Sequence, residues 1–229
     1  MITKQEVIKL LSAGQIGIMP TDTIYGLVGQ ALNRETVERI YKVRRRSPGK
    51  PLIVLISSVD NLKSFGISLD YKEKMFLNKF WPGQVSVILP CKSSKFKYLH
   101  RGTKTLAIRL PKKKSILEIL KKTGPLVAPS ANPEGLPPAN NLKEAKGYFG
   151  KISIPSLNPS LRKGGRKPES RDQKKFPLPL RRGGLGRGLG VDFYYGRGTL
   201  KSAPSTLVKL ENGKIKVLRE GAVRIKKQL

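Results

Sequence analysis

Cysteine and histidine are almost absent from this sequence. It contains one cysteine, Cys91, and one histidine, His100. A single cysteine excludes a disulfide framework and a thiolate metal site, and a single histidine excludes a histidine metal cluster. A Ser-His-Asp triad would have to use His100, which stands in a basic stretch without a neighbouring carboxylate. We expect His100 to be a surface loop residue.

Long apolar runs and the common targeting and nucleotide motifs are also missing. No apolar run reaches the roughly 18 residues of a membrane helix. The first residues lack the basic-then-apolar order of a signal peptide. The sequence therefore predicts a cytoplasmic protein that does not bind membranes. It also has no Gly-x-x-x-x-Gly-Lys-Ser/Thr phosphate loop, so any bound ATP must be held in another way.

Acidic residues are scarce relative to basic ones. The chain has 15 Asp and Glu against 46 Lys and Arg, a net charge of +31. This excess favours a polyanionic partner such as a nucleotide, RNA or phosphate, although surface charge can also serve solubility alone. Aromatic residues make up only 7% of the chain, which weakens the case for base stacking on single-stranded RNA.

The order of apolar patterns predicts an α/β fold of mixed α+β type. With 229 residues the chain is long enough for one large domain with a real core. Helical periodicity marks residues 2–11, 34–45, 71–80, 115–122 and 142–149. Short apolar runs predict strands at 16–20, 52–56, 85–89, 105–110, 126–128 and 191–195.

Residues 156–190 interrupt this order. They hold seven Gly and four Pro, with ten Lys and Arg against two acidic residues. Such a segment buries too little apolar surface to offset its chain entropy. We therefore expect one folded domain formed by residues 1–155 and 191–229, with 156–190 as a flexible basic insertion. Either an inert loop or an arm that docks RNA or a partner fits this composition.

Asn212-Gly213 stands between two alternating runs, 205–211 and 214–219, and predicts a two-residue hairpin turn. This register places Val208 opposite Val217. By the same count it pairs Thr206 with Arg219.

Polar residues gather at the ends of the predicted strands, where α/β folds build ligand sites. Cations and hydroxyls dominate the set, and carboxylates and imidazoles are rare. The set suits a site that neutralises phosphates and orients a small polar substrate. Its members are Thr21, Thr23, Lys42, Arg44, Lys50, Arg109, Ser130, Asn132, Ser205, Thr206 and Arg219.

Six linked motifs resemble the YrdC-type threonylcarbamoyl-AMP synthases. They occur in the order found in that family. The motifs are Pro20-Thr21-Asp22-Thr23-Ile24-Tyr25-Gly26-Leu27, Lys42-Val43-Arg44, Trp81-Pro82-Gly83, Leu106-Ala107-Ile108-Arg109-Leu110-Pro111, Pro129-Ser130-Ala131-Asn132, and Pro204-Ser205-Thr206 with Arg219-Glu220-Gly221.

The resemblance implies a twisted mixed sheet with flanking helices around a basic concave cavity. It also implies a nucleotidyltransferase that converts L-threonine, bicarbonate and ATP into threonylcarbamoyl-AMP and pyrophosphate. The product would feed a tRNA threonylcarbamoyl transferase complex, and contact with tRNA or double-stranded RNA is expected. Mg²⁺ would arrive on ATP, without protein side chains as ligands.

Matching positions carry the family's roles onto this chain. The catalytic pair is Lys42 and Arg44. The threonine-contacting positions are Thr23, Arg109, Ala128 and Ser205. The ATP-contacting positions are Arg44, Lys50, Thr105, Ser130, Asn132 and Arg219.

Some positions depart from the family pattern. Asp22 stands where Glu is usual, Arg45 where proline is usual, and Leu55 where some members have a threonine-contacting histidine. Gln84, Ser86 and Pro138 depart as well. Two alternatives to the synthase remain: an RNA-binding module of this fold, and a carbamoyl-transfer domain like that of hydrogenase-maturation proteins. The latter are long chains with zinc-finger cysteines, which this chain lacks.

Overall fold

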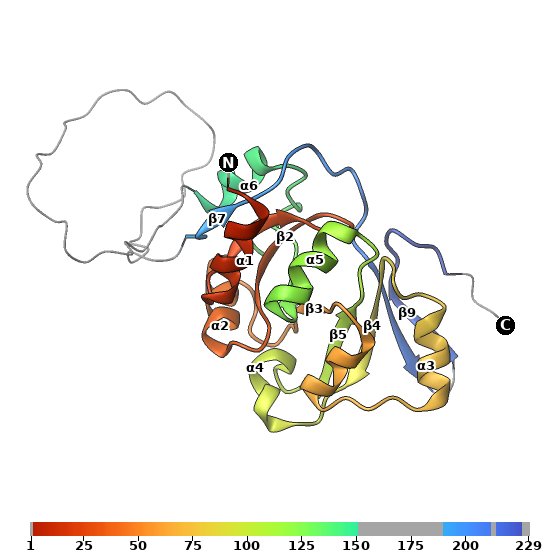
Figure 1. Ribbon diagram of the computed structural model, residues 1–229. Helices are drawn as coiled ribbons and strands as arrows, with labels where there is room; N and C mark the ends of the chain where they lie inside the picture. The colour runs from red at the N-terminus through yellow and green to blue at the C-terminus, as the bar shows by residue number, and fades with distance from the viewer. Residues whose placement is uncertain (1, 151–189, 212–213, 226–229) are drawn as a thin grey trace, which may run out of the picture.

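The computed structural model describes residues 2–150, 190–211 and 214–225 (Figure 1). The predicted insertion at 156–190, apart from Gly190, and the predicted Asn212-Gly213 turn lie outside these ranges. The elements run in the order α1 (Lys4–Ser12), β1 (Gly17–Pro20), β2 (Tyr25–Gln30), α2 (Arg34–Arg44), β3 (Ile53–Leu55), η1 (Val59–Phe65), α3 (Tyr71–Asn78), β4 (Val85–Pro90), η2 (Ser94–Phe96), α4 (Lys97–His100), β5 (Thr105–Arg109), α5 (Lys114–Thr123), β6 (Leu126–Val127), α6 (Leu142–Phe149), β7 (Phe193–Tyr194), β8 (Thr206–Glu211) and β9 (Lys214–Arg219).

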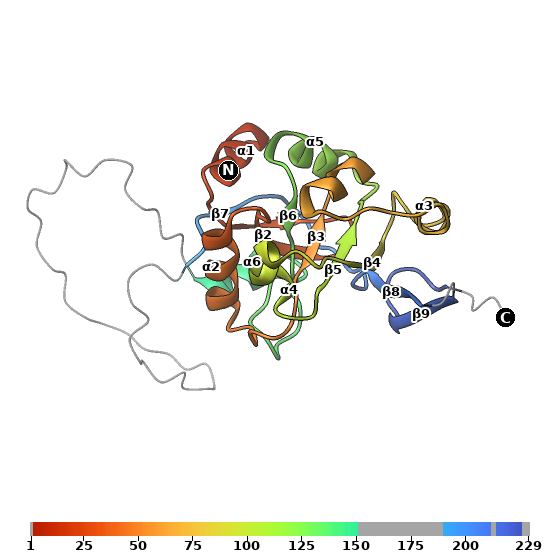
Figure 2. The ribbon, with the colours of Figure 1, turned by 90° about the horizontal axis from the view of Figure 1, so that it is seen from below.

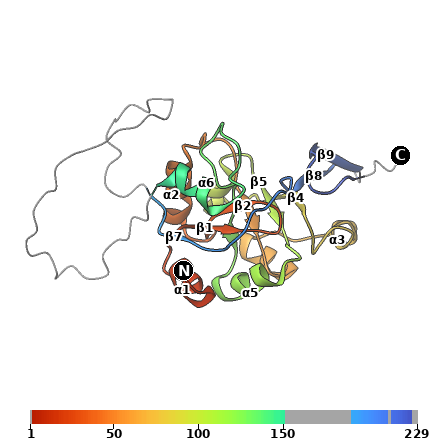
Figure 3. The same cartoon turned by 90° about the horizontal axis from the view of Figure 1, so that it is seen from above.

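The strands of the described residues form one mixed sheet, in the order β7-β1-β2-β6-β3-β5-β4-β8-β9. The pairs β1–β7, β3–β5 and β4–β8 are parallel, and the other neighbouring pairs are antiparallel. Seen from below, α1 and α5 cover one side of the sheet, with α2 and α6 on the other (Figure 2), and the view from above agrees (Figure 3). The predicted mixed sheet with flanking helices is confirmed. Within the described ranges, no helix is both long and apolar enough to cross a membrane.

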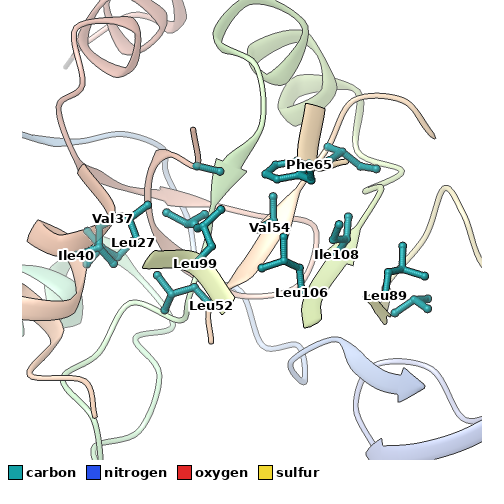
Figure 4. Packing of buried hydrophobic residues seen from close by; sticks show 14 of the residues in the cluster. Leu27, Val37, Ile40, Leu52, Val54, Phe65, Leu89, Leu99, Leu106 and Ile108 are labelled. Atoms are coloured by element: carbon teal, nitrogen blue, oxygen red, sulfur yellow. The ribbon is translucent and has the colours of Figure 1, made fainter. Parts of the chain in front are cut away.

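Successive strand residues pack into two different apolar clusters, as alternation requires. The larger cluster takes Val54 and Ile108 together with Val37 and Ile40 of α2 (Figure 4). The smaller cluster contains Leu55, which packs with residues of α1 and α5. Every second residue of β3 and β5 therefore faces the side that carries α1 and α5.

Strand β2 was not predicted from the sequence, because two glycines interrupt its apolar pattern. Gly29 is required by packing: a Cβ there would lie 2.5 Å from Cγ2 of Thr36 on α2. Gly26 lies close to the turn before it, where a Cβ would be 3.1 Å from Cγ2 of Thr21. The helix can approach β2 this closely only because Gly29 has no side chain, whereas a side chain at Gly26 would require the turn to shift by a few tenths of an ångström.

The β8–β9 pairing confirms most of the predicted register and corrects its end. Val208 faces Val217, as predicted. A bulge between Leu207 and Val208 then shifts the register, so that Arg219 faces Leu207 and the predicted Thr206–Arg219 pair is wrong. A bulge sets two residues of one strand against one of the other, and no sequence signal marked it.

Strand β7 fastens the chain after residue 190 to the edge of the sheet. Asp192, with its side chain only 1% exposed, accepts the Ile16 N–H at 2.9 Å. Its two carboxylate oxygens also lie 2.5 and 2.7 Å from the guanidinium of Arg39 on α2. The Arg39 guanidinium also donates to the carbonyl of Gly190 at 2.8 Å. One carboxylate thus joins β1, α2 and β7.

We expect Asp192→Ala to lower the free energy of unfolding by about 3 kcal/mol, because it leaves a partly buried arginine and a buried N–H without their partner. Urea unfolding followed by circular dichroism would measure the change. Asp60→Ala is the matched control, since the Asp60–Lys63 pair is more than 80% exposed on both sides and should contribute little. Equal stability of the two variants would show that Asp192 does not anchor β7.

Candidate active site

A small pocket of about 60 Å³ crosses one face of the sheet, from the β1–β2 turn to the β8–β9 strands. Its lining includes all four residues predicted to contact threonine. It also includes two of those predicted to contact ATP, Ser130 and Arg219. The pocket is lined by Thr21, Thr23, Ile24, Gly26, Ile53, Arg109, Ala128, Ser130, Pro204, Ser205 and Arg219. Residues from six separate segments therefore meet at the place where the sequence predicts the amino-acid site.

Hydroxyl hydrogen bonds shape the turn between β1 and β2. Oγ1 of Thr21 donates to the carbonyl of Ile24 at 2.6 Å and lies 3.2 Å from Oγ1 of Thr23. The N–H of Thr23 donates to Oγ1 of Thr21 at 3.2 Å. Nζ of Lys113, just before α5, holds the carbonyl of Thr21 at 3.2 Å. The two threonines are buried and fixed against each other, so the pocket wall is formed before any ligand arrives.

Arg109 and Asp22 form a buried ion pair at this wall. The Arg109 Nη2 atom lies 2.9 Å from the Asp22 Oδ1 atom, and the side chains are 3% and 5% exposed. Burial lowers the pKa of Arg109 and raises the pKa of Asp22, and in each case the partner's charge opposes the effect of burial. Among the described residues, Nε of Arg109 has no hydrogen-bond partner. A buried donor without a partner, on a residue that lines a pocket, is suited to a ligand carboxylate.

Ser205 and Arg219 close the opposite side. Oγ of Ser205 lies 2.8 Å from Oγ of Ser86 on β4. Nη2 of Arg219 donates to the Ser205 carbonyl at 2.8 Å, and it lies 3.3 Å from Oγ of the same serine. Although the predicted Thr206–Arg219 pairing is wrong, Arg219 still reaches the adjacent serine. Thr206 turns away from Arg219, and its hydroxyl donates to the carbonyl of Val223.

Arg44 ends α2 and is almost fully buried, with 3% exposure. Its Nε donates to the Asn132 carbonyl at 2.8 Å, and its Nη2 lies 3.2 Å from Oγ of Ser130. A lysine-and-arginine-rich helix end is usually a solvated surface, but Arg44 is buried. The spacing Val37, Ile40, Tyr41, Arg44 already placed it on the buried stripe. Burial, with a smaller contribution from Arg46, lowers the pKa of Arg44 to about 10, so it remains charged at neutral pH.

Five of the residues predicted to act on threonine or ATP do not line this pocket: Arg44 and Asn132, described above, and Lys42, Lys50 and Thr105. Lys42 is exposed on α2, and Lys50 is exposed and paired with Glu134. Thr105 begins β5, about 13 Å from Arg109 at the usual rise per strand residue. It shares a face with Arg109 by alternation but lines a larger pocket of about 640 Å³. A ligand contacting both ends of β5 would have to be extended, as a nucleotide joined to an amino acid is.

His100 corrects another expectation. It is buried at the end of α4 and is not a surface loop residue. Its Nδ1 accepts the Gly102 N–H at 3.1 Å, and its Nε2 lies 3.3 Å from the Ser93 carbonyl. The ring therefore fixes the turn after α4. Leu55, which stands where some relatives have histidine, packs against α1 and α5.

Sequence reasoning gave no role to Asp22 or Glu134. Asp22 stands between two site threonines directly after a strand, and this position could have marked it as a site residue. Glu134 follows Asn132 by two residues, and nothing local marked it. Among the described residues, no three His, Cys, Asp or Glu side chains group closely enough to hold a metal ion.

Comparison with known proteins gives concordant matches. Residues 9–164 match the family model Sua5_yciO_yrdC, described as "Telomere recombination". A threonylcarbamoyl-AMP synthase of Bacillus subtilis is 36% identical over 130 residues, covering 56% of this chain and 38% of that protein. This chain therefore spans about two fifths of that relative's length.

Solved structures share the fold. P. abyssi Sua5, complexed with L-threonine, superposes with a TM-score of 0.72 at 23% identity, covering 96% of this chain and 55% of that one. E. coli YciO superposes with a TM-score of 0.71 at 18% identity, covering 99% of this chain and 92% of that one. The family model covers more than half of the chain and agrees with the fold and the motif order, so the protein belongs to the Sua5/YciO/YrdC family.

Proposed function

We propose that this protein joins L-threonine, bicarbonate and ATP into threonylcarbamoyl-AMP with release of pyrophosphate, as a nucleotidyltransferase. The observation that supports it most is the convergence of Thr23, Arg109, Ala128 and Ser205 on one small pocket. A relative of the same fold is complexed with L-threonine, and curated relatives are named threonylcarbamoyl-AMP synthases.

The pocket can accept each part of an amino acid. Nε of Arg109 offers a charge-assisted hydrogen bond to the carboxylate. The hydroxyls of Thr23 and Ser205 can exchange hydrogen bonds with the substrate hydroxyl. Ile24, Ile53 and Ala128 line the remaining wall and suit the threonine methyl group.

The reaction needs two steps, the formation of a carbamate and a substitution at phosphorus. The threonine amine first attacks CO₂ and loses a proton to solvent, or attacks bicarbonate with loss of water, and either route gives a carbamate. A carbamate oxygen then attacks the α-phosphorus of ATP, and pyrophosphate leaves with the electrons of the broken P–O bond. Both steps develop negative charge near the buried cation Arg44 and the arginine Arg219, which would stabilise it. ATP enters as its Mg²⁺ complex, and the metal shares the charge of the leaving group.

Purified protein should release pyrophosphate from ATP only when threonine and bicarbonate are both present. Serine should react roughly fivefold to tenfold more slowly, because it lacks the methyl group that contacts the apolar wall. A coupled pyrophosphate assay with each component omitted in turn measures both effects. Equal release without threonine would disprove the proposal.

The same assay separates the alternatives. Pyrophosphate release with carbamoyl phosphate in place of threonine and bicarbonate would favour the hydrogenase-maturation type of chemistry. No turnover, combined with salt-dependent RNA binding, would favour an RNA-binding module. A tRNA threonylcarbamoyl transferase that accepts the adenylate is the proposed partner.

A further inference from the structure

The carboxylate of Glu134 lies in a nest of three donors. Oε2 accepts the Ser47 N–H at 2.5 Å and the Ser47 hydroxyl at 2.9 Å. Oε1 pairs with Nζ of Lys50 at 2.5 Å. A backbone N–H, a hydroxyl and an ammonium group that converge on one point form a donor set suited to a phosphate group.

The backbone of the loop that carries these donors is held by contacts that do not involve Glu134. The Arg46 side chain donates to the carbonyls of Lys50 and Pro51, each at 3.0 Å. The Tyr41 hydroxyl donates to the Lys50 carbonyl at 2.9 Å, and the Lys50 N–H donates to the Ser47 carbonyl at 3.2 Å. The loop backbone, including the Ser47 N–H, would therefore keep its shape if the carboxylate moved away.

The nest adjoins the candidate active site. Glu134 follows Asn132 by two residues, and its N–H donates to the Arg44 carbonyl at 2.9 Å. Arg44 in turn contacts Ser130 and Asn132. An anion in the nest would lie beside the buried arginine that the proposed reaction uses.

The carboxylate stays charged but is not locked in place. Its hydrogen bonds with Lys50 and Ser47 lower the pKa of Glu134 to about 2, so it is an anion throughout the working pH range. The Lys50 side chain is 62% exposed and that of Glu134 is 23% exposed. An ion pair this open to water is weak, so a more highly charged group can displace it.

Lys50 is already expected to contact ATP, and we propose that Glu134 acts as a built-in competitor there, since its carboxylate occupies the donors of Ser47 and Lys50 that nucleotide phosphates must take over. The ligand's identity as ATP rests on the proposed function, whereas the anion site itself does not. Glu134 thus sets the apparent affinity for phosphate-bearing ligands, since binding is weakened by the fraction of molecules in which the site is already filled.

Glu134→Gln tests this proposal, because it keeps the size of the side chain and removes its charge. Calorimetry with inorganic triphosphate and, separately, with Mg-ATP should show about threefold to tenfold tighter binding than in the parent. In Lys50→Met, the added change Glu134→Gln should give no such gain, since the shared donor is gone. Glu118→Gln is the matched control. Glu118 lies on α5, away from the Ser47–Lys50 loop, and it also pairs at 2.5 Å with a partly exposed lysine, Lys4.

Unchanged or weaker triphosphate binding by Glu134→Gln would overturn the inference, as would an equal gain in the Glu118 control. Absence of triphosphate binding by every variant would overturn it too. Tighter triphosphate binding without threonine-dependent pyrophosphate release would support the anion site and reject the proposed function. The two failures are therefore distinguishable.

Discussion

Arg44→Ala should lower turnover about 100-fold or more, because it removes a preorganised cation from the point where the proposed reaction develops negative charge. The burial of Arg44 adds a second effect. The Asn132 carbonyl and the Ser130 hydroxyl lose their partner, so the free energy of unfolding should fall by about 1–3 kcal/mol. Turnover measured well below the melting temperature, beside urea unfolding, separates the two effects.

Arg34→Ala is the control for this change, since Arg34 begins the same helix and is exposed. It should leave both activity and stability close to those of the parent. If Arg44→Ala kept full turnover, Arg44 would have only a structural role, and the catalytic assignment would have to be withdrawn.

Arg109→Ala should have the largest effect on stability, with a loss of about 3–5 kcal/mol, because it leaves the buried Asp22 carboxylate without a counter-charge. Activity should also be lost, since the donor proposed for the substrate carboxylate disappears. Adding Asp22→Ala should restore part of the stability and none of the activity. Recovery of activity in the double variant would show that Arg109 does not bind substrate.

The stability of Arg109→Ala should depend on pH in a defined direction. Burial raises the pKa of Asp22 above its ordinary 3.8, and Arg109 is the largest influence that opposes this rise. Without Arg109 the folded-state pKa is higher still, so the folded protein binds a proton that the unfolded chain releases. Stability should therefore rise as the pH falls from 7 toward the unfolded pKa. A thermal unfolding series over this range checks the sign, and a falling stability would contradict it.

The sequence predicts most local structure of this fold. Helices such as α2 and α5 show a buried stripe at helical spacing, and strands such as β3 lie in continuous apolar runs. Strand β2 was not predicted because it contains two glycines, which are there for close packing with Thr36 and Thr21. That reason exists only in three dimensions. The sheet order also depends on long-range pairing, which no local pattern encodes.

The candidate site was predictable to the extent that its motifs are local. Thr23, Arg109 and Ser205 were identified from their motifs, and the structure brings them into one pocket. The bulge at Leu207 and the ion pair of Lys50 with Glu134 were not predictable. The bulge is a local irregularity that no residue type marks. The ion pair joins two segments that are far apart in the sequence.

The positions of β7, β8 and β9 have a consequence for the order of events during synthesis. Residues after 190 supply both borders of the sheet: β7 beside β1, and β8 with β9 beside β4. Until they leave the ribosome, a nascent chain has two unpaired strand borders, which favour association with other chains. It also lacks Ser205 and Arg219, which line the pocket. The step that closes the sheet is thus the step that completes the pocket, so a chain arrested before it would be both inactive and prone to aggregate.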